Sequence, residues 1–181
     1  YSWPTVNPCR VDQRTVEGDF GSADFFESNL VNVYGLDALE HLLFSGDESI
    51  CPSQVSPVSD GSWAALGTYG ISENRAVYSA AISGQIISES ERLLDLWSGD
   101  GGYAELLALG EGTPYTDEVE ALNAVFDALF YLEIVTKDLK LAKPLGLVEC
   151  DEELCLDDLE GLHSQTTLSS VRANLIGFQS L

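Results

Sequence analysis

The chain has 181 residues, enough for a domain with a substantial core, and its 45% hydrophobic and 21% charged residues are typical of a globular protein. Its 30 acidic residues against 8 basic ones give a formal net charge of -22, which repels nucleic-acid phosphates and anionic membrane surfaces. No apolar run approaches the roughly 18 residues that span a bilayer. These features exclude a nucleic-acid-binding domain and argue against a membrane-spanning helix within the chain.

Helical periodicity dominates the sequence and begins with two segments in its first quarter. Residues 11–16 predict a short helix, and residues 29–44 predict one amphipathic helix that Asn29 caps. We expect the apolar stripe of this second helix to be buried. The stripe consists of leucines at helical spacing, Leu36, Leu39, Leu42 and Leu43.

The rest of the chain also shows helical spacing of apolar residues. Few of its segments alternate apolar and polar residues with the period of a strand. The fold class predicted is therefore all-α, a helical bundle with long loops. The remaining predicted helices cover residues 62–97 with a kink between Gly67 and Ser72, residues 103–109, a segment from Thr116 to before Pro144, and a last one from about Thr166.

We expect residues 1–181 to form a single helical domain that is part of a longer polypeptide. The sequence begins at Tyr1 and contains no Met. At its other end the helical spacing of apolar residues continues to Leu181 without a cap or a breaker.

The cysteines predict two disulfides and an oxidising compartment, because an even number of them lies in loops. Cys9 and Cys51 each lie beside a proline, and Cys150 and Cys155 bracket the short acidic stretch DEEL and are able to close a small ring. A zinc site is the alternative, but the chain has no CxxC pair and only two histidines.

The segment GLDALEHLLF carries the strongest candidate for chemistry. Asp37 and Glu40 are three residues apart and share a helix face, and His41, four residues after Asp37, lies beside them. Two carboxylates and an imidazole on one ridge can bind a metal ion or move a proton. The alternative is a solvated acidic face that includes a histidine, and spacing alone leaves both interpretations open.

Two other groups of polar residues have plainer explanations. Lys137, Lys140 and Lys143 lie near the end of a predicted helix, where cations complement the helix dipole, with capture of an anion as the alternative. His163 stands alone near the start of a predicted helix. We expect it to have a structural or surface role.

Several stretches together resemble the imelysin-like family. GLDALEHLLF resembles the GxHxxE segment of that family, with Gly35, Asp37 and Glu40 at its three defined positions. The stretches YSWPTVNPCRVDQRTVE (1–17) and VTKDLKLAKPLGL (135–147) and the closing ANLIGFQSL look like the same family. The resemblance therefore touches the beginning, the middle and the end of the chain.

The resemblance implies an extracytoplasmic helical protein, periplasmic or on the outer surface, of a kind that is often lipid-anchored and built from two helical-bundle halves. This chain resembles one half. Its partners would then be the remainder of its own polypeptide or a second bundle half, and any membrane anchor would lie outside the chain. The family is classed with metallopeptidases, and many members look like iron-uptake or metal-binding components.

The chain departs from the family pattern at one position, because Asp37 stands where the motif has its histidine. A carboxylate still supplies oxygen ligands, which suit harder cations such as iron, calcium or manganese. The loss of the imidazole weakens the case for a zinc peptidase. His41 follows Glu40 directly, so its side chain points about 100° further around the helix and replaces the motif histidine only in part.

Three hypotheses follow for the function. The first, which we favour, is a protein that binds a divalent or ferric metal ion, or a metal-bearing ligand, through Asp37, Glu40 and His41. The second is a metallopeptidase with Glu40 as general base. The third is a structural or interaction module in which the motif is vestigial.

Overall fold

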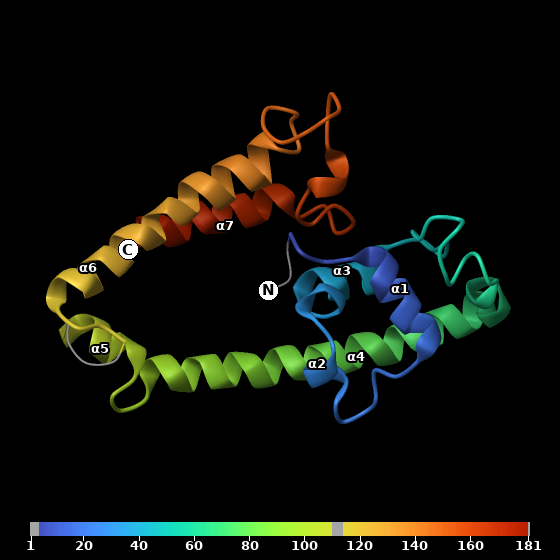
Figure 1. The fold of residues 1–181 in the computed structure, drawn as a ribbon, viewed down its shortest axis with the longest axis horizontal. Helices are drawn as coiled ribbons and strands as arrows, with labels where there is room; N and C mark the ends of the chain where they lie inside the picture. The colour runs from blue at the N-terminus through green and yellow to red at the C-terminus, as the bar shows by residue number, and fades with distance from the viewer. Residues whose placement is uncertain (1–3, 110–113, 181) are drawn as a thin grey trace. The chain divides into compact units, whose positions relative to one another are not determined.

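The structure, a computed structural model, describes residues 4–109 and 114–180, which form helices and loops with no strand among them (Figure 1). The prediction of an all-α fold is confirmed. The contacts divide the chain into two compact units. The first consists of Tyr1–Ser88 and His163–Gln165, and the second of Glu89–Leu162 and Thr166–Leu181.

The first unit is built around α1, which packs against η1 and α3. Helix α1 begins where the Asn7 side chain accepts a hydrogen bond from the Arg10 amide at 2.9 Å, and it ends at Gly18 in the left-handed conformation. The helices of this unit are α1 (Pro8–Glu17), α2 (Phe25–Ser28), η1 (Val31–Val33), α3 (Leu36–Phe44) and the first part of α4 (Ser62–Ser98).

The core of the first unit forms around Tyr78 on α4, which is fully buried. Its ring stacks on Phe20 with centroids 4.7 Å apart and meets Phe25 edge to face. Its hydroxyl donates a hydrogen bond to the carbonyl of Val33, so the buried polar atom is satisfied. The other core residues are Val11, Ala38, Leu42 and Ile82.

The helix predicted over residues 29–44 is shorter than expected, and this prediction was wrong at its start. Helix α3 begins at Leu36, and the residues before it form the separate turn η1. Gly35 divides the two with a φ of 103°, a conformation that residues with a Cβ rarely adopt. The glycine of the motif therefore sets the direction in which α3 leaves the preceding chain.

The predicted buried face of α3 was wrong in part, because Leu42 and Leu39 pack in the core as expected but the other two leucines do not. Leu36 and Leu43 are 52% and 57% exposed, whereas Ala38 and Leu42 are buried. Residues three and four apart share a helix face, so burying Ala38 and Leu42 also turns Asp37 and His41 inward. Spacing permitted either face, and packing against α1 selects the one that carries the polar residues.

Helix α4 confirms the predicted long helix and its interruption. Gly67 has φ 63° and ψ 168°, which breaks the helical backbone at the start of the expected region. The helix continues past Ser88, where the first unit ends, to Ser98.

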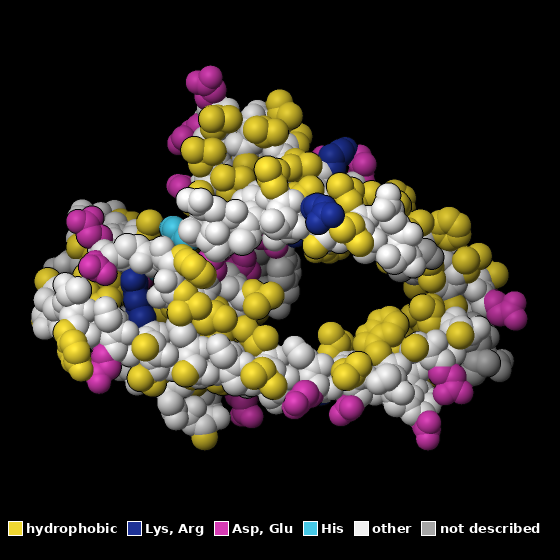
Figure 2. All heavy atoms as spheres, turned by 180° about the vertical axis from the view of Figure 1, so that it is seen from behind, with side chains coloured by type: hydrophobic (Ala, Val, Ile, Leu, Met, Phe, Trp, Pro, Cys, Tyr) yellow, Lys and Arg dark blue, Asp and Glu magenta, His cyan; other side chains and the backbone are white. Residues whose placement is uncertain are grey.

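The second unit contains the remaining predicted helices. Helix α7 packs along η2, an uninterrupted continuation of α6 with π-helical hydrogen bonding. Figure 2 shows hydrophobic side chains gathered over these helices, and several from α6 are exposed, including Val119, Leu122 and Phe126. The helices are α5 (Tyr103–Leu109), α6 (Glu118–Tyr131), η2 (Leu132–Ala142), η3 (Leu156–Asp158) and α7 (Thr167–Gln179).

Both predicted disulfides are present. Cys9 pairs with Cys51 in the first unit, and Cys150 pairs with Cys155 around the acidic loop of the second. Such bonds are typical of proteins from oxidising compartments. Across residues 4–109 and 114–180, no helix has both the length and the apolar character to cross a membrane.

Candidate functional site

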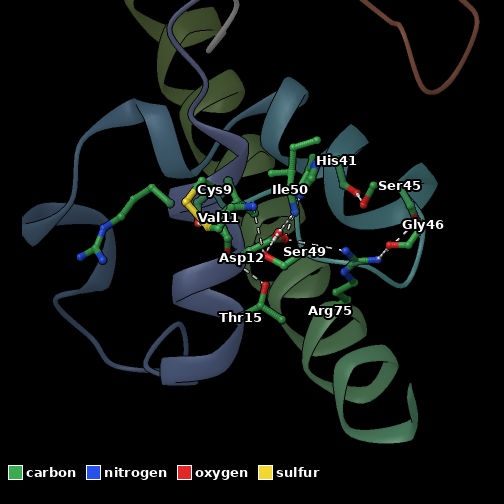
Figure 3. A network of polar contacts seen from close by, with 12 residues as sticks. Cys9, Val11, Asp12, Thr15, His41, Ser45, Gly46, Ser49, Ile50 and Arg75 are labelled. Carbon is green, nitrogen blue, oxygen red and sulfur yellow. Dashed lines mark hydrogen bonds and ion pairs between the residues drawn. A yellow bond between two sulfur atoms is a disulfide. The ribbon is translucent and has the colours of Figure 1, made fainter. Parts of the chain in front are cut away.

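The polar centre of the first unit is Asp12 on α1, whose side chain is fully buried (Figure 3). One carboxylate oxygen, Oδ1, lies 2.9 Å from Nε2 of His41. The other, Oδ2, accepts hydrogen bonds from the Ser49 hydroxyl at 2.8 Å and the Ile50 amide at 2.9 Å. Hydrogen bonds from these donors stabilise the buried Asp12 carboxylate, which in turn holds the donor groups in place.

Arg75 on α4 provides the positive charge that faces this carboxylate. Its Nη2 lies 3.7 Å from Oδ1 of Asp12, and its side chain is 8% exposed. Its Nη1 donates to the carbonyls of Gly46 at 2.9 Å and Ser45 at 3.3 Å, and the guanidinium lies over the ring of Trp63. The arginine therefore holds the loop after α3 and balances the buried acid.

The disulfide explains how the loop that contacts Asp12 is held in place. Cys9 lies on α1 one turn before Asp12, and Cys51 directly follows Ile50. The bond ties residues 49–51 to α1, so the Ser49 hydroxyl and the Ile50 amide point at the carboxylate (Figure 3). Covalent and hydrogen-bonded contacts thus act on the same short segment.

His41 is held in one tautomer by this arrangement. An ionised carboxylate only accepts hydrogen bonds, so Nε2 of His41 carries the proton that faces Asp12. The ring is 3% exposed, and its other nitrogen, Nδ1, is buried without a hydrogen-bond partner among the described residues. In the neutral ring with its proton on Nε2, Nδ1 has a lone pair. Histidines that bind metals commonly donate their other N–H to a carboxylate in this way.

The two carboxylates predicted at the site differ in their surroundings. Asp37 lies one turn before His41 on the inward side of α3 and is 9% exposed. Glu40 is partly exposed, and its Oε1 accepts a hydrogen bond from the Ser164 amide at 2.7 Å. The structure thus places Asp37, Glu40 and His41 on one helix, and His41 joins the Asp12 network.

The segment His163–Gln165 belongs to the same unit as α3. The hydrogen bond from Ser164 to Glu40 holds it there, and the ring of His163 lies 5.8 Å from that of His41, centroid to centroid, at an interplanar angle of 62°. Sequence reasoning assigned His163 only a structural or surface role. Its position beside His41 was not predicted.

Sequence reasoning also missed Asp12, Ser49 and Arg75. Asp12 is one of 30 acidic residues, and no local motif distinguishes it. Within the described ranges, no group of three or more His, Cys, Asp or Glu side chains is close enough to hold a metal ion by itself. Nδ1 of His41 is therefore a buried polar atom for which the described residues supply no partner.

The second unit holds a separate buried ion pair. Nζ of Lys140 lies 2.7 Å from Oε2 of Glu160 and donates to the side chain of Asn174 at 2.9 Å. Burial raises the pKa of the nearby Tyr131, and the Glu160 carboxylate raises it further. Lys137 and Lys143 also pair with carboxylates, so each lysine of the predicted cluster has an acidic partner.

The family model described as Imelysin matches residues 7–181 of the chain. No curated protein and no solved structure matches it.

Proposed function

Because the chain belongs to the imelysin family, we propose that it is an exported protein that binds a metal ion, or a ligand carrying one, at α3. The single observation that supports this most is the buried Nδ1 of His41, which has no described partner and whose ring is oriented by Asp12. Leaving a polar atom buried and unpaired costs about 1 to 3 kcal/mol unless something binds to it. A metal ion would supply the missing interaction.

In this proposal His41 is the anchoring ligand, and Asp37 and Glu40 are the acids on the same helix. Because these three side chains do not form a group that holds an ion in the described structure, a ligand that carries the metal supplies the rest of the coordination. Asp12 orients the imidazole through Nε2, which leaves Nδ1 available to the metal, and Arg75 lies beside the Asp12 carboxylate and helps to hold it in place. The net charge of -22 attracts cations to the whole surface. The metal would be a divalent ion or ferric iron.

We favour binding over proteolysis because of the position of Glu40. A metallopeptidase would use this carboxylate as the base that takes a proton from water. Its Oε1 instead accepts the amide hydrogen of Ser164, which holds the segment His163–Gln165 against α3. Glu40 therefore has a positioning role in the first unit that catalysis does not require.

The proposal places the protein outside the cytoplasm, in the periplasm or at the outer surface. The two disulfides support an oxidising compartment, and the family resemblance supports export. A membrane anchor, if the protein has one, would belong to a segment other than the helices described. The proposed partner is the remainder of the polypeptide or a second bundle half, which would cover exposed apolar side chains of α6 such as Val119 and Phe126.

The test is calorimetric titration of the protein with Zn²⁺, Mn²⁺, Ca²⁺ and Fe²⁺, repeated on His41→Gln, Glu40→Gln and Asp37→Asn. We expect one of these ions to bind at one per chain and each variant to bind it more weakly, with His41→Gln affected most. Glu73→Gln, an exposed acid on α4, is the control. Equal affinity in His41→Gln, with its helical content unchanged by circular dichroism, would contradict the proposed site.

A further inference from the structure

The second unit has a small pocket that the proposed metal site does not use. It lies where α7 packs along η2, next to the end of α6, and its volume is about 150 Å³ (Figure 1). An apolar cavity of about this size holds a benzene ring in other proteins. The pocket is therefore large enough for a ligand of one ring. Six residues of these helices line it: Ala128, Tyr131, Leu132, Thr136, Asn174 and Phe178.

Thr136 is the unusual residue in the wall of this pocket. Its side chain is 2% exposed, and its hydroxyl has no hydrogen-bond partner among the described residues. A threonine within a helix can donate its hydroxyl to the carbonyl four residues earlier, as Thr15 of α1 does to Val11 at 2.9 Å. Thr136 lies in the π-helical segment η2 and makes no such bond. Because an unpaired buried hydroxyl is unfavourable, a ligand that reaches it supplies a missing interaction.

Asn174 on α7 is the second polar residue of the pocket, and a buried ion pair orients it. Nζ of Lys140 donates to Oδ1 of Asn174 at 2.9 Å and lies 2.7 Å from Oε2 of Glu160. An ammonium group only donates hydrogen bonds, so the amide oxygen of Asn174 has to face Lys140. Its NH₂ group is then the group left for a ligand, and the orientation is set before a ligand binds.

The aromatic side chains and the charges around the pocket define the ligand further. The rings of Tyr131 and Phe178 are 46% and 38% exposed, so a flat apolar molecule gains contact area by covering them. The buried ion pair behind Asn174 carries no net charge, and the net charge of -22 repels anions. We propose that this pocket binds a small, uncharged aromatic molecule with a hydrogen-bond acceptor, of the aryl carboxamide class, independently of the metal site at α3.

The experiment titrates the ¹⁵N-labelled protein with benzamide and follows its ¹H–¹⁵N spectrum. We expect saturable shifts of the Asn174 side-chain amide and of backbone amides in η2 and α7. Thr136→Val keeps the shape of the side chain and removes the hydroxyl, so it should weaken benzamide binding about tenfold. Benzoate, which has the same shape and a negative charge, should bind more weakly than benzamide. Thr15→Val, in the first unit, is the matched control and should bind benzamide as the parent protein does.

Urea denaturation without ligand gives a second readout. Thr136→Val should unfold at the same urea concentration as the parent or a higher one, because its hydroxyl has no bond to lose, whereas Thr15→Val should unfold at a lower one. The inference is overturned if benzamide does not bind saturably, if Thr136→Val binds it as the parent does, or if benzoate binds as tightly. A Thr136→Val protein as destabilised as Thr15→Val also overturns it, since the hydroxyl then has a partner in the free protein.

Discussion

Replacing Asp12 with asparagine tests the network at the centre of the first unit, because the change keeps the shape of the side chain and removes its charge. In the parent protein both carboxylate oxygens accept hydrogen bonds, one from His41 and the other from Ser49 and Ile50. Asparagine has only one accepting oxygen. If that oxygen keeps the two donors of the loop, the amide NH₂ faces His41.

Two consequences follow from this exchange. First, Nε2 of His41 has to become the acceptor, so the proton moves to Nδ1 and the lone pair proposed for the metal is lost. Second, the buried Arg75 loses the carboxylate that lies 3.7 Å from it. Removing one partner of a buried ion pair costs about 3 to 5 kcal/mol, and since the loop contacts survive we expect about 3 kcal/mol.

Urea denaturation followed by circular dichroism measures the stability, and ¹⁵N spectra of the two histidines report the tautomer. The control is Asp19→Asn, because Asp19 pairs with Arg14 at the surface, and its loss should change stability little. The reasoning would be refuted by an Asp12→Asn protein that unfolds within about 0.5 kcal/mol of the parent and keeps the proton on Nε2.

Three further predictions concern the rest of the chain. Serine at both Cys9 and Cys51 should lower the free energy of unfolding by about 4 kcal/mol, since the bond closes a separation of 42 residues; denaturation curves of the oxidised protein and the variant test this, and a loss under about 1 kcal/mol would contradict it. Burial raises the pKa of Tyr78, so the folded protein holds the hydroxyl proton more tightly than the unfolded chain does. The contribution of Tyr78 to the free energy of unfolding should therefore be fully present below the unfolded pKa of about 10 and should fall as the pH rises beyond it. Tyr78→Phe should flatten this pH dependence in denaturation curves, and an unchanged slope would count against it. Alanine at Lys140 should cost about 3 to 5 kcal/mol because its carboxylate partner stays buried, whereas alanine at the exposed Lys137 should change stability little, and equal effects by chemical denaturation would show that the buried pair is not critical.

The sequence predicted the features that depend on residues close together in the chain. The kink at Gly67 needed only a glycine within a helical pattern, and the two disulfides needed only an even number of cysteines in loops. The first turn of α3 failed because Gly35 adopts a positive φ that helical spacing does not reveal. Local chemistry thus predicted most helices but misplaced several of their starts, including those of α1, α3 and α6.

The candidate site was predicted in part, because half of it depends on tertiary contacts. Asp37, Glu40 and His41 share one helix, so their spacing brought them together in the sequence. Asp12 joins them only when α1 packs on α3, and the hydrogen bond from Ser164 to Glu40 spans 124 positions. No periodicity encodes contacts of this range.

The exposed leucines of α3 show why its inward face was also misjudged. Hydrophobicity favoured Leu36 and Leu43 as core positions, yet the buried face carries an acid and a histidine. Burying polar groups is unfavourable unless they are paired, and Asp12 and Arg75 provide that pairing for His41. A functional site is where such a departure from the hydrophobic pattern is expected.

The measurement that tests the central claim most directly is the metal content of the native protein, determined by elemental mass spectrometry after gel filtration without chelator. The account predicts one divalent metal ion or one ferric ion per chain, lost in His41→Gln. A protein that is metal-free, and that also fails to take up any of these ions when they are added, would contradict it and leave α3 with a structural role.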